Sequence, residues 1–207
     1  RDDFLVAQCA NKINNLKSLS EKTNFYKKFL KNSKIIKKFM FDKKILSTLK
    51  HLKGKRVDPL MSQMIFKKAK SKFSVQSWQP HQDNSYSKNK NGHYLTTNVF
   101  LNKSTVKNGT LYIWEKSHNY GIFKFNFKKS YREVDGKPGN VVQTNKSFNI
   151  KVLNFNKGDL LILHGNLVHG SFPNKSKTSR PLISVSYIPV GEKFIAGKNA
   201  QRARQYI

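Results

Sequence analysis

The most constraining feature of the sequence is a series of short segments, rich in aromatic and β-branched residues, that turn-forming residues separate. Such segments are typical of β-strands, because branched and aromatic side chains pack well on a pleated sheet. The segments are residues 60–66, 95–101, 110–114, 148–154, 159–163, 168–172 and 181–188. A succession of many short strands favours a β-barrel or a β-sandwich.

The region before these segments has a different pattern, because its apolar residues recur at helical spacing. We expect residues 1–52 to form an amphipathic helical layer that covers a sheet. Residues 60–190 would form the β core, and residues 191–207 a C-terminal tail. The residues that stand where helix N-caps are expected are Asn24, Ser33 and Asp42.

The stretch 119–146 interrupts the series of predicted strands. It has weak periodicity and contains Gly136, Pro138 and Gly139. We expect it to be a long loop that lies over the mouth of the barrel. With 207 residues the chain is long enough to bury a hydrophobic core, and we predict one domain over residues 1–207.

The formal net charge of +29 would attract anionic ligands, lipid surfaces or nucleic acid at low salt. Of the 40 basic residues, however, 34 are Lys and six are Arg, and the Lys residues are spread along the whole length. Surfaces that read bases or clamp phosphates depend on the planar guanidinium group, which this chain mostly lacks. We therefore expect no specific nucleic-acid partner. A small-molecule substrate is expected instead, and an anion is one candidate.

The single cysteine, Cys9, excludes an internal disulfide framework and fits a reducing compartment, with the cytoplasm as the default. The longest strongly apolar stretches, such as residues 160–163, are far shorter than the roughly 20 residues that cross a bilayer, so no transmembrane segment is expected. The first residue is Arg1, so a targeting peptide could precede this sequence. The sequence does not indicate an oligomeric state.

Three residues form a candidate metal site. His81 and Asp83 are one residue apart, so on an extended strand their side chains leave from the same face. A second segment begins with a Gly-Asp turn at Gly158, continues as a buried strand, and returns as a second hairpin arm that carries His169. Two imidazoles and one carboxylate are the facial triad of non-haem Fe(II), which leaves positions open for a bidentate 2-oxo acid and for dioxygen.

A candidate anion site follows the metal segment. Arg180 opens the strand 181–188, on the face shared by Leu182, Ser184 and Ser186, which is more polar than the opposite face. A buried Arg on this side requires a carboxylate, and the distal carboxylate of 2-oxoglutarate would fit its donors. Ser171, two residues after His169 on the same face, could donate to this carboxylate. The competing interpretation is that Arg180 is a surface residue after a polar loop.

The sequence resembles the phytanoyl-CoA dioxygenase (PhyH) family at four places that occur in the family's order. Segment 78–86, Trp-Gln-Pro-His-Gln-Asp-Asn-Ser-Tyr, is similar to the first metal motif. Segment 108–121 contains Asn-Gly and then Ser-His-x-x-Gly, as in the family. The stretch 158–180 resembles the second metal and co-substrate motif and includes Pro173-Asn174-x-Ser176.

This resemblance implies a double-stranded β-helix, a jelly-roll or cupin-like core, with a helical layer at its N-terminal side. It also implies iron on His81, Asp83 and His169, and 2-oxoglutarate on Ser171 and Arg180. Asn98 stands beside the co-substrate, where the family often has an aromatic residue, and Glu115-Lys116 stands where Pro-Gly is common. The implied reaction is hydroxylation of an unactivated C–H bond, with consumption of dioxygen and release of succinate and CO2.

Two other classes of function remain open from the residues alone. One is a basic nucleic-acid-binding protein without catalysis, and the other is a cupin-like metalloenzyme that does not use 2-oxoglutarate. His164 is expected to be a core residue rather than a ligand, and His118 to fix a turn. The aromatic residues Trp78, Tyr86 and Trp114 are candidates for either the pocket or the core.

Overall fold

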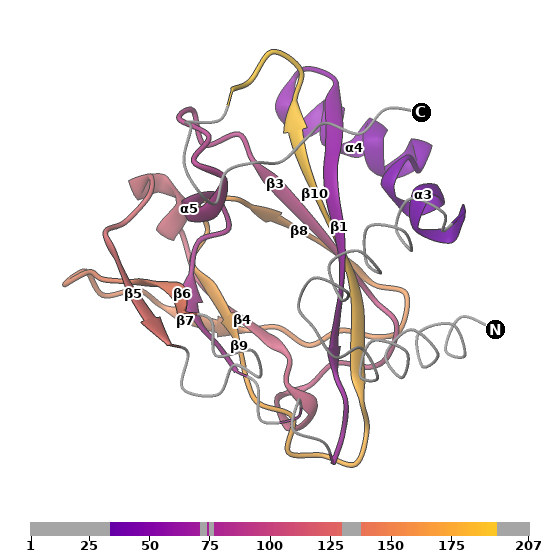
Figure 1. Ribbon diagram of the computed structural model, residues 1–207, viewed down its shortest axis with the longest axis vertical. Helices are drawn as coiled ribbons and strands as arrows, with labels where there is room; N and C mark the ends of the chain where they lie inside the picture. The colour runs from indigo at the N-terminus through magenta and orange to yellow at the C-terminus, as the bar shows by residue number, and fades with distance from the viewer. Residues whose placement is uncertain (1–33, 71–73, 75–76, 130–137, 194–207) are drawn as a thin grey trace, which may run out of the picture.

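Eight strands form two antiparallel sheets of four strands each (Figure 1). The computed structural model describes residues 34–70, 74, 77–129 and 138–193. The major sheet has the strand order β1-β10-β3-β8, and the minor sheet has the order β2-β9-β4-β7. The strands are β1 (Val57–Lys67), β2 (Trp78–His81), β3 (Leu95–Phe100), β4 (Leu111–Trp114), β7 (Ile150–Val152), β8 (Leu160–His164), β9 (His169–Ser171) and β10 (Arg180–Pro189).

The order in which the chain visits the two sheets defines the fold. It passes from the major to the minor sheet and back through β1, β2 and β3, and it alternates again from β7 to β10. This winding is that of the predicted double-stranded β-helix. Each of the seven predicted segments overlaps one of these strands.

The prediction for residues 158–169 was wrong in one respect. β8 and β9 do not form a hairpin, because β8 pairs with β3 in the major sheet while β9 pairs with β2 and β4 in the minor sheet. β8 is also an edge strand, and Leu160 on it is exposed, so the strand is not buried throughout. The turn before it is as predicted, because Gly158 has a positive φ of 92° that favours glycine.

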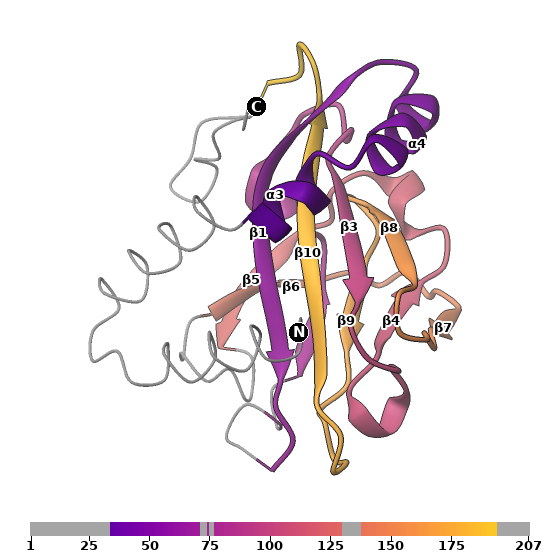
Figure 2. The same ribbon diagram turned by 90° about the vertical axis from the view of Figure 1, so that its right-hand side faces the viewer.

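Two helices cover the outer face of the major sheet (Figure 2). They are α3 (Lys34–Met40) and α4 (Lys43–Lys53). Their buried residues Ile36, Met40 and Leu49 pack against the outward residues of β10, which are Ile183, Val185 and Tyr187. The helical layer is therefore confirmed for residues 34–53, and the part before Lys34 lies outside the described residues.

The predicted N-cap Asp42 is confirmed at the start of α4. Its Oδ1 atom accepts hydrogen bonds from the backbone N–H groups of Lys44 (2.9 Å) and Ile45 (3.1 Å). These bonds satisfy two of the amides that the first helical turn leaves without a partner. The other two predicted caps, Asn24 and Ser33, lie outside the described residues.

The space between the sheets holds a second apolar cluster. Phe100 of β3, Leu182 of β10 and Leu111 of β4 are buried there together. Phe100 stacks on Phe155 with 3.8 Å between ring centroids. Because alternate residues of a strand face opposite sides, the inward face of β10 carries Arg180, Leu182, Ser184 and Ser186, as the sequence predicts.

The predicted long loop at residues 119–146 was wrong in part, because the chain there forms a two-stranded hairpin. Its strands are β5 (Phe125–Lys129) and β6 (Pro138–Val142), and residues 130–137 lie outside the described residues. Asn140 fixes the hairpin to the core, because its backbone N–H donates to the Tyr86 hydroxyl (2.8 Å) and its side chain donates to Ser85 Oγ (3.0 Å).

The remaining short helices are α5 (Asn84–Ser87), η1 (Val106–Asn108) and η2 (Ser117–Tyr120). Within the described part of the chain, no helix combines the length and the apolar character that spanning a membrane requires.

Candidate metal and co-substrate site

The two predicted histidine ligands lie opposite each other on neighbouring strands of the minor sheet. His81 is the last residue of β2 and pairs in register with His169, the first residue of β9. Their ring centroids are 4.4 Å apart. Antiparallel pairing therefore brings together two imidazoles that are far apart in the sequence.

Asp83 completes the group from a turn rather than from a strand. The prediction of one extended strand through His81 and Asp83 was wrong, because β2 ends at His81 and Asp83 has helical dihedral angles as the N-cap of α5. Its Oδ1 atom nevertheless lies 3.8 Å from His81 Nε2 and 3.7 Å from His169 Nε2. All three ligand atoms lie within 4.8 Å of one another, and no other such group of three occurs among the residues described.

Hydrogen bonds direct one atom of each residue toward the centre of the group. His81 Nδ1 donates to the carbonyl of Gln79 (2.7 Å), and His169 Nδ1 donates to the carbonyl of Leu167 (3.0 Å). Because a carbonyl only accepts, both Nδ1 atoms carry the proton and both Nε2 atoms keep a free lone pair. Asp83 Oδ2 accepts from Thr96 Oγ1 (2.7 Å), which leaves Oδ1 facing the two imidazoles.

The electrostatics also fit a metal site. Burial and the neighbouring His169 lower the pKa of His81 to about 4, although Asp83 and the Gln79 carbonyl act in the opposite direction. At neutral pH the imidazole is therefore uncharged, which is the form that binds a metal. Ligand atoms with bonds of about 2.1 Å to one ion lie up to roughly 4.2 Å apart, so the two distances to Asp83 are within reach of a single ion.

A buried network of side-chain amides, the amide clamp (Gln82, Asn84 and Asn166), fixes the turn that carries Asp83. Asn84 Nδ2 donates to Asn166 Oδ1 (2.8 Å), and Gln82 Nε2 donates to the carbonyl of Asn166. The backbone N–H of Asn84 also donates to the carbonyl of Gly165 (2.8 Å). These bonds join the first ligand segment to the loop that leads to His169, so the two ligand segments are held relative to each other.

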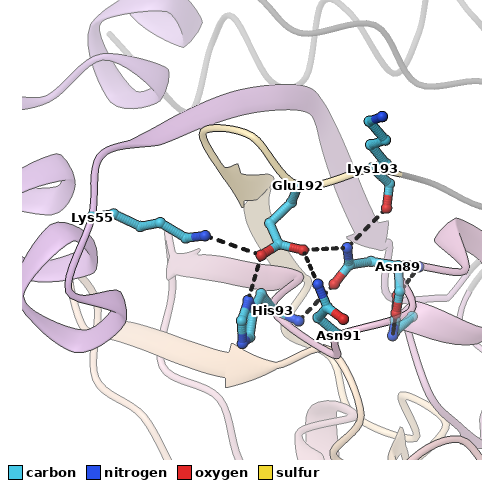
Figure 3. Close-up of polar contacts among 7 residues, drawn as sticks. Lys55, Asn89, Asn91, His93, Glu192 and Lys193 are labelled. Atoms are coloured by element: carbon cyan, nitrogen blue, oxygen red, sulfur yellow. Dashed lines mark hydrogen bonds and ion pairs between the residues drawn. The ribbon is translucent and has the colours of Figure 1, made fainter.

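The amide clamp continues to the end of β10 through Asn89 and Glu192 (Figure 3). Asn84 Oδ1 accepts from the backbone N–H of Asn89 (2.8 Å), and Asn89 Nδ2 donates to Glu192 Oε2 (3.1 Å). Glu192 also accepts from His93 Nδ1 (2.8 Å) and Lys55 Nζ (3.1 Å). Burial acts to raise the pKa of Glu192, but these hydrogen bonds lower it to about 2, so the carboxylate remains charged at neutral pH.

The second part of the site contains two buried basic residues, Arg180 and Lys67. Arg180 is 1% exposed, and its Nε donates to the carbonyl of Gly109 (3.1 Å), while its Nη1 has no hydrogen-bond partner in the described structure. Lys67 is fully buried and donates from Nζ to Ser171 Oγ (2.7 Å) and to the carbonyl of Phe172. Arg180 is thus not the surface residue of the competing interpretation.

Ser171 and Asn98 occupy the positions that the sequence predicts. Ser171 is buried two residues after His169 on the same strand, and it connects the metal end to Lys67 through the hydrogen bond described above. Asn98 is buried on β3, opposite Ser184 of β10 and on the same face as Thr96, which contacts Asp83. Both residues therefore line the space between the sheets near the triad.

The remaining histidines and aromatic residues have clear places. His164 and His118 lie side by side with 5.3 Å between ring centroids, and neither belongs to the metal group. Trp78 and Tyr86 flank His81, with centroid distances of 6.1 Å and 6.3 Å. Trp114 instead stacks on Phe148 at 5.6 Å.

The structure adds residues that the sequence did not single out, namely Lys67 and the amide clamp. Lys67 is one of 34 lysines and Asn84 one of 21 asparagines, so residue type alone could not distinguish them. The available signal was the position of Gln82 and Asn84 in the sequence, directly beside the predicted ligands His81 and Asp83.

Comparisons with known proteins agree with this geometry. The family model described as "Phytanoyl-CoA dioxygenase (PhyH)" matches residues 4–182. No protein with a curated description matches the sequence.

Several solved structures share this fold at low sequence identity. The non-heme monooxygenase ThoJ in its apo form superposes with a TM-score of 0.64 at 20% identity, over 83% of this chain and 62% of that one. EctD from S. alaskensis, solved with 2-oxoglutarate and 5-hydroxyectoine, has a TM-score of 0.66 at 17% identity, over 86% and 64%. The epimerase SnoN, in complex with Fe3+, alpha ketoglutarate and nogalamycin RO, has a TM-score of 0.65 at 16% identity, over 78% and 61%. The chain thus spans somewhat over 60% of the length of each.

Proposed function

This chain belongs to the phytanoyl-CoA dioxygenase (PhyH) family, and we propose that it is an iron(II)- and 2-oxoglutarate-dependent dioxygenase. The proposed reaction is hydroxylation of an unactivated C–H bond in a small-molecule or acyl/lipid-type substrate, with release of succinate and CO2. The proposed metal ligands are His81, Asp83 and His169. The proposed co-substrate residues are Arg180, Ser171 and Asn98.

The observation that carries the proposal is the position of the triad relative to the buried basic residues Lys67 and Arg180. One atom from each of His81, Asp83 and His169 faces a common centre, and the other polar atom of each is engaged elsewhere. Two residues farther along β9, Ser171 contacts Lys67, and Lys67 in turn pairs in register with Arg180. A 2-oxo diacid would match this arrangement. Its 2-oxo acid group would bind the metal at the triad, and its second carboxylate would lie at the basic end of the site.

The donor set also fits iron(II) better than a structural metal. Two neutral imidazoles and one carboxylate fill three positions on one side of an ion, whereas structural zinc sites supply four protein ligands. When bound there, iron(II) would supply the open positions at which the 2-oxo acid and dioxygen react.

The protein's own contribution is to bind, orient and exclude water. The Nδ1–H bonds to backbone carbonyls fix the orientation of both imidazoles, and the amide clamp fixes the turn of Asp83. Arg180 and Ser171 would bind the distal carboxylate, and their burial keeps that end of the site dry. Trp78 and Tyr86 beside His81 would shape the side of the site that a substrate reaches.

Two observations favour this function over the alternatives from sequence. A cupin-like metalloenzyme that does not use 2-oxoglutarate has no need for Arg180 to be buried with an unpaired Nη1. A basic protein that only binds nucleic acid has no need for a triad whose ligand atoms converge inside the fold. The proposed substrate is a small-molecule or acyl/lipid-type compound, and the net charge of +29 favours an anion.

The test is an anaerobic titration with Fe(II) and 2-oxoglutarate. The wild type should bind one Fe(II) and develop the weak visible charge-transfer band of a 2-oxo acid chelate. Asp83→Ala and His169→Ala should lose the band, while Asp159→Ala, which removes an exposed carboxylate, should keep it. A band of equal intensity in Asp83→Ala would remove the metal assignment, and tight Fe(II) binding without any response to 2-oxoglutarate would leave a metal site with another co-substrate.

A further inference from the structure

A cluster of apolar side chains lies on the surface where η2, β4 and β7 meet. Phe148, just before β7, contacts three other rings, with centroid distances of 5.6 Å to Trp114, 5.6 Å to Tyr120 and 5.7 Å to Phe123. Ile150 of β7 pairs in register with Trp114, and residues paired in this way point to the same face of a sheet. These five residues form the aromatic patch.

The aromatic patch is open to solvent. Tyr120 is 54% exposed and Ile150 is 56% exposed. β7 is an edge strand of the minor sheet (Figure 2), and all three of its residues are exposed. A contiguous apolar surface marks an interaction site more often than a single exposed side chain does, because leaving it in water is costly.

Three exposed lysines adjoin the aromatic patch. Lys146 Nζ lies 4.7 Å from the centroid of the Tyr120 ring. Lys116 immediately precedes η2, and Lys124 immediately follows Phe123. The apolar centre is therefore combined with positive charge at its margin.

The carboxylate nearest to these lysines in the sequence is already engaged. Glu115 accepts a hydrogen bond from Asn149 Nδ2, and its Oε1 lies 3.8 Å from Lys151 Nζ. Its charge is thus balanced by Lys151, and the positive charge at the margin of the aromatic patch is left to attract an anionic partner.

The aromatic patch is joined directly to the segment that carries two of the proposed metal ligands. Gln82, between His81 and Asp83, donates from Nε2 to the carbonyl of Gly121 (2.7 Å), and its Oε1 accepts from the backbone N–H of Phe123 (2.8 Å). Gln82 is fully buried, so water does not compete for these bonds. A partner bound to the aromatic patch would therefore lie beside the metal segment.

We propose that the aromatic patch and its three lysines dock the protein onto a bilayer surface that contains anionic lipids. The exposed rings enter the boundary between the headgroups and the acyl chains, where amphipathic aromatic side chains are favoured. The lysines extend to the level of the lipid phosphates. This inference goes beyond the proposed function, and it agrees with the acyl/lipid-type substrate named there.

Charge and shape argue against the other occupants. A second copy of the chain would bring like-charged lysines together between two molecules of net charge +29, which is unfavourable. A nucleic acid would pair with the lysines and stack on the rings, but it would leave the aliphatic side chain of Ile150 uncovered. An anionic bilayer accommodates both the apolar centre and the charged margin.

The experiment measures binding of the full chain to vesicles by co-sedimentation at physiological salt. One kind of vesicle contains phosphatidylcholine alone, and the other also contains phosphatidylserine. Two variants change the docking surface separately in its apolar part and in its charge, and they are Tyr120→Ser with Ile150→Ser, and Lys116→Gln with Lys146→Gln.

Matched controls make the same kinds of change elsewhere on the surface. The apolar control is Leu52→Ser with Val106→Ser, at positions that are 57% and 49% exposed. The charge control is Lys43→Gln with Lys44→Gln on α4, where both side chains are exposed. Because every substituted side chain is exposed, all variants are expected to fold, and circular dichroism checks this.

We expect the wild type to bind vesicles with phosphatidylserine at least about tenfold more tightly than phosphatidylcholine alone. Each of the two docking-surface variants should weaken this binding by about 10- to 30-fold, because it removes two charges or two apolar side chains from the interface. The controls should stay within about threefold of the wild type, because distant charges are largely screened at physiological salt.

Equal losses in the docking-surface variants and the controls would overturn the proposal, as would wild-type binding by both docking-surface variants or no binding of the wild type to either vesicle. Titration with single-stranded oligouridylate and analytical ultracentrifugation test the other occupants. If the docking-surface variants lose oligouridylate binding or a dimer instead of vesicle binding, the surface belongs to nucleic acid or to a second copy, and the proposal is wrong. None of these measurements involves iron or 2-oxoglutarate, so their failure is distinct from failure of the proposed function.

Discussion

The ligand-free protein should become more stable as the pH rises from 7 to 9, and Lys67 should be the cause. The pKa of Lys67 is about 6 in the folded protein, against 10.5 for an ordinary lysine. Between these two values the unfolded chain binds about one proton more than the folded chain, so the free energy of unfolding increases with pH.

The magnitude follows from the same pKa difference. One proton corresponds to about 1.4 kcal/mol per pH unit, so Lys67 should add on the order of 2–3 kcal/mol between pH 7 and 9. For a domain of this size, that is a rise in melting temperature of roughly 5–10 °C. His81 contributes little in this window, because its pKa is lowered from 6.5 to about 4 and both values lie below pH 7.

The assay is thermal unfolding followed by circular dichroism at pH 7, 8 and 9, with a chelator present and no 2-oxo acid. The wild type is compared with Lys67→Met, and the quantity of interest is the difference between their slopes against pH. Other lysines cancel in this difference, and the exposed Lys107→Met should follow the wild type. Equal slopes for the wild type and Lys67→Met would refute the reasoning, because they would show that Lys67 is not neutral in the folded protein.

Three further predictions follow from individual contacts, and a fourth follows from the spread of Lys along the sequence. Arg180→Ala should weaken 2-oxoglutarate binding by roughly 30- to 4,000-fold in titrations of iron-loaded protein, with Fe(II) binding retained and only partial recovery in Arg180→Lys, because an ammonium lacks the paired donors. Gly109→Ala should lower the free energy of unfolding in urea by about 1–3 kcal/mol, because φ is 91° and the added Cβ meets Lys67 and the Phe172 carbonyl. Phe100→Ala should cost about 3–5 kcal/mol in the same assay, because the ring is fully buried and stacks on Phe155. Duplex DNA binding, if present, should be non-specific and should vanish near physiological salt in fluorescence anisotropy, and sequence-selective binding there would contradict this.

The core strands could be predicted because their apolar residues either alternate with polar ones or form continuous runs. Both patterns can be recognised in a short stretch of sequence. β10 is buried along its whole length, and its apolar and β-branched residues identify it without any knowledge of its partners. β2 was not predicted as a strand, because it has four residues, includes Pro80 and pairs irregularly with β9. The β5–β6 hairpin was not predicted, because β6 begins with Pro138-Gly139 and its buried residues Asn140 and Val142 are too few to impose a period.

Some residues of the candidate site could also be predicted from the sequence, and others could not. The triad could be predicted because histidine and aspartate are scarce here, so a pair at the right spacing carries information even in one sequence. The turn at Asp83 could not, because hydrogen bonds from Gln82 and Asn84 to Asn166 determine it, and these contacts join residues about 80 positions apart. Lys67 could not be predicted for the same reason, because its burial depends on β9 and β10 rather than on its neighbours in β1.

The two ends of the site differ in how the protein satisfies their polar groups, and this difference bears on how binding and stability are coupled. At the metal end, the second polar atom of each ligand residue already has a hydrogen-bond partner in the protein. The main free-energy cost there, in the absence of metal, is that of holding three ligand atoms close together. At the other end, Arg180 Nη1 lacks a partner in the described structure, and Lys67 is held as a mostly neutral amine. A dicarboxylate that restores both would stabilise the fold by more than its own contacts, because it also removes a cost that the empty protein carries. A monoacid that binds only the metal cannot do this, so it should stabilise the protein against heat less than a dicarboxylate does, and the difference includes the cost of the unsatisfied Arg180 in the empty site.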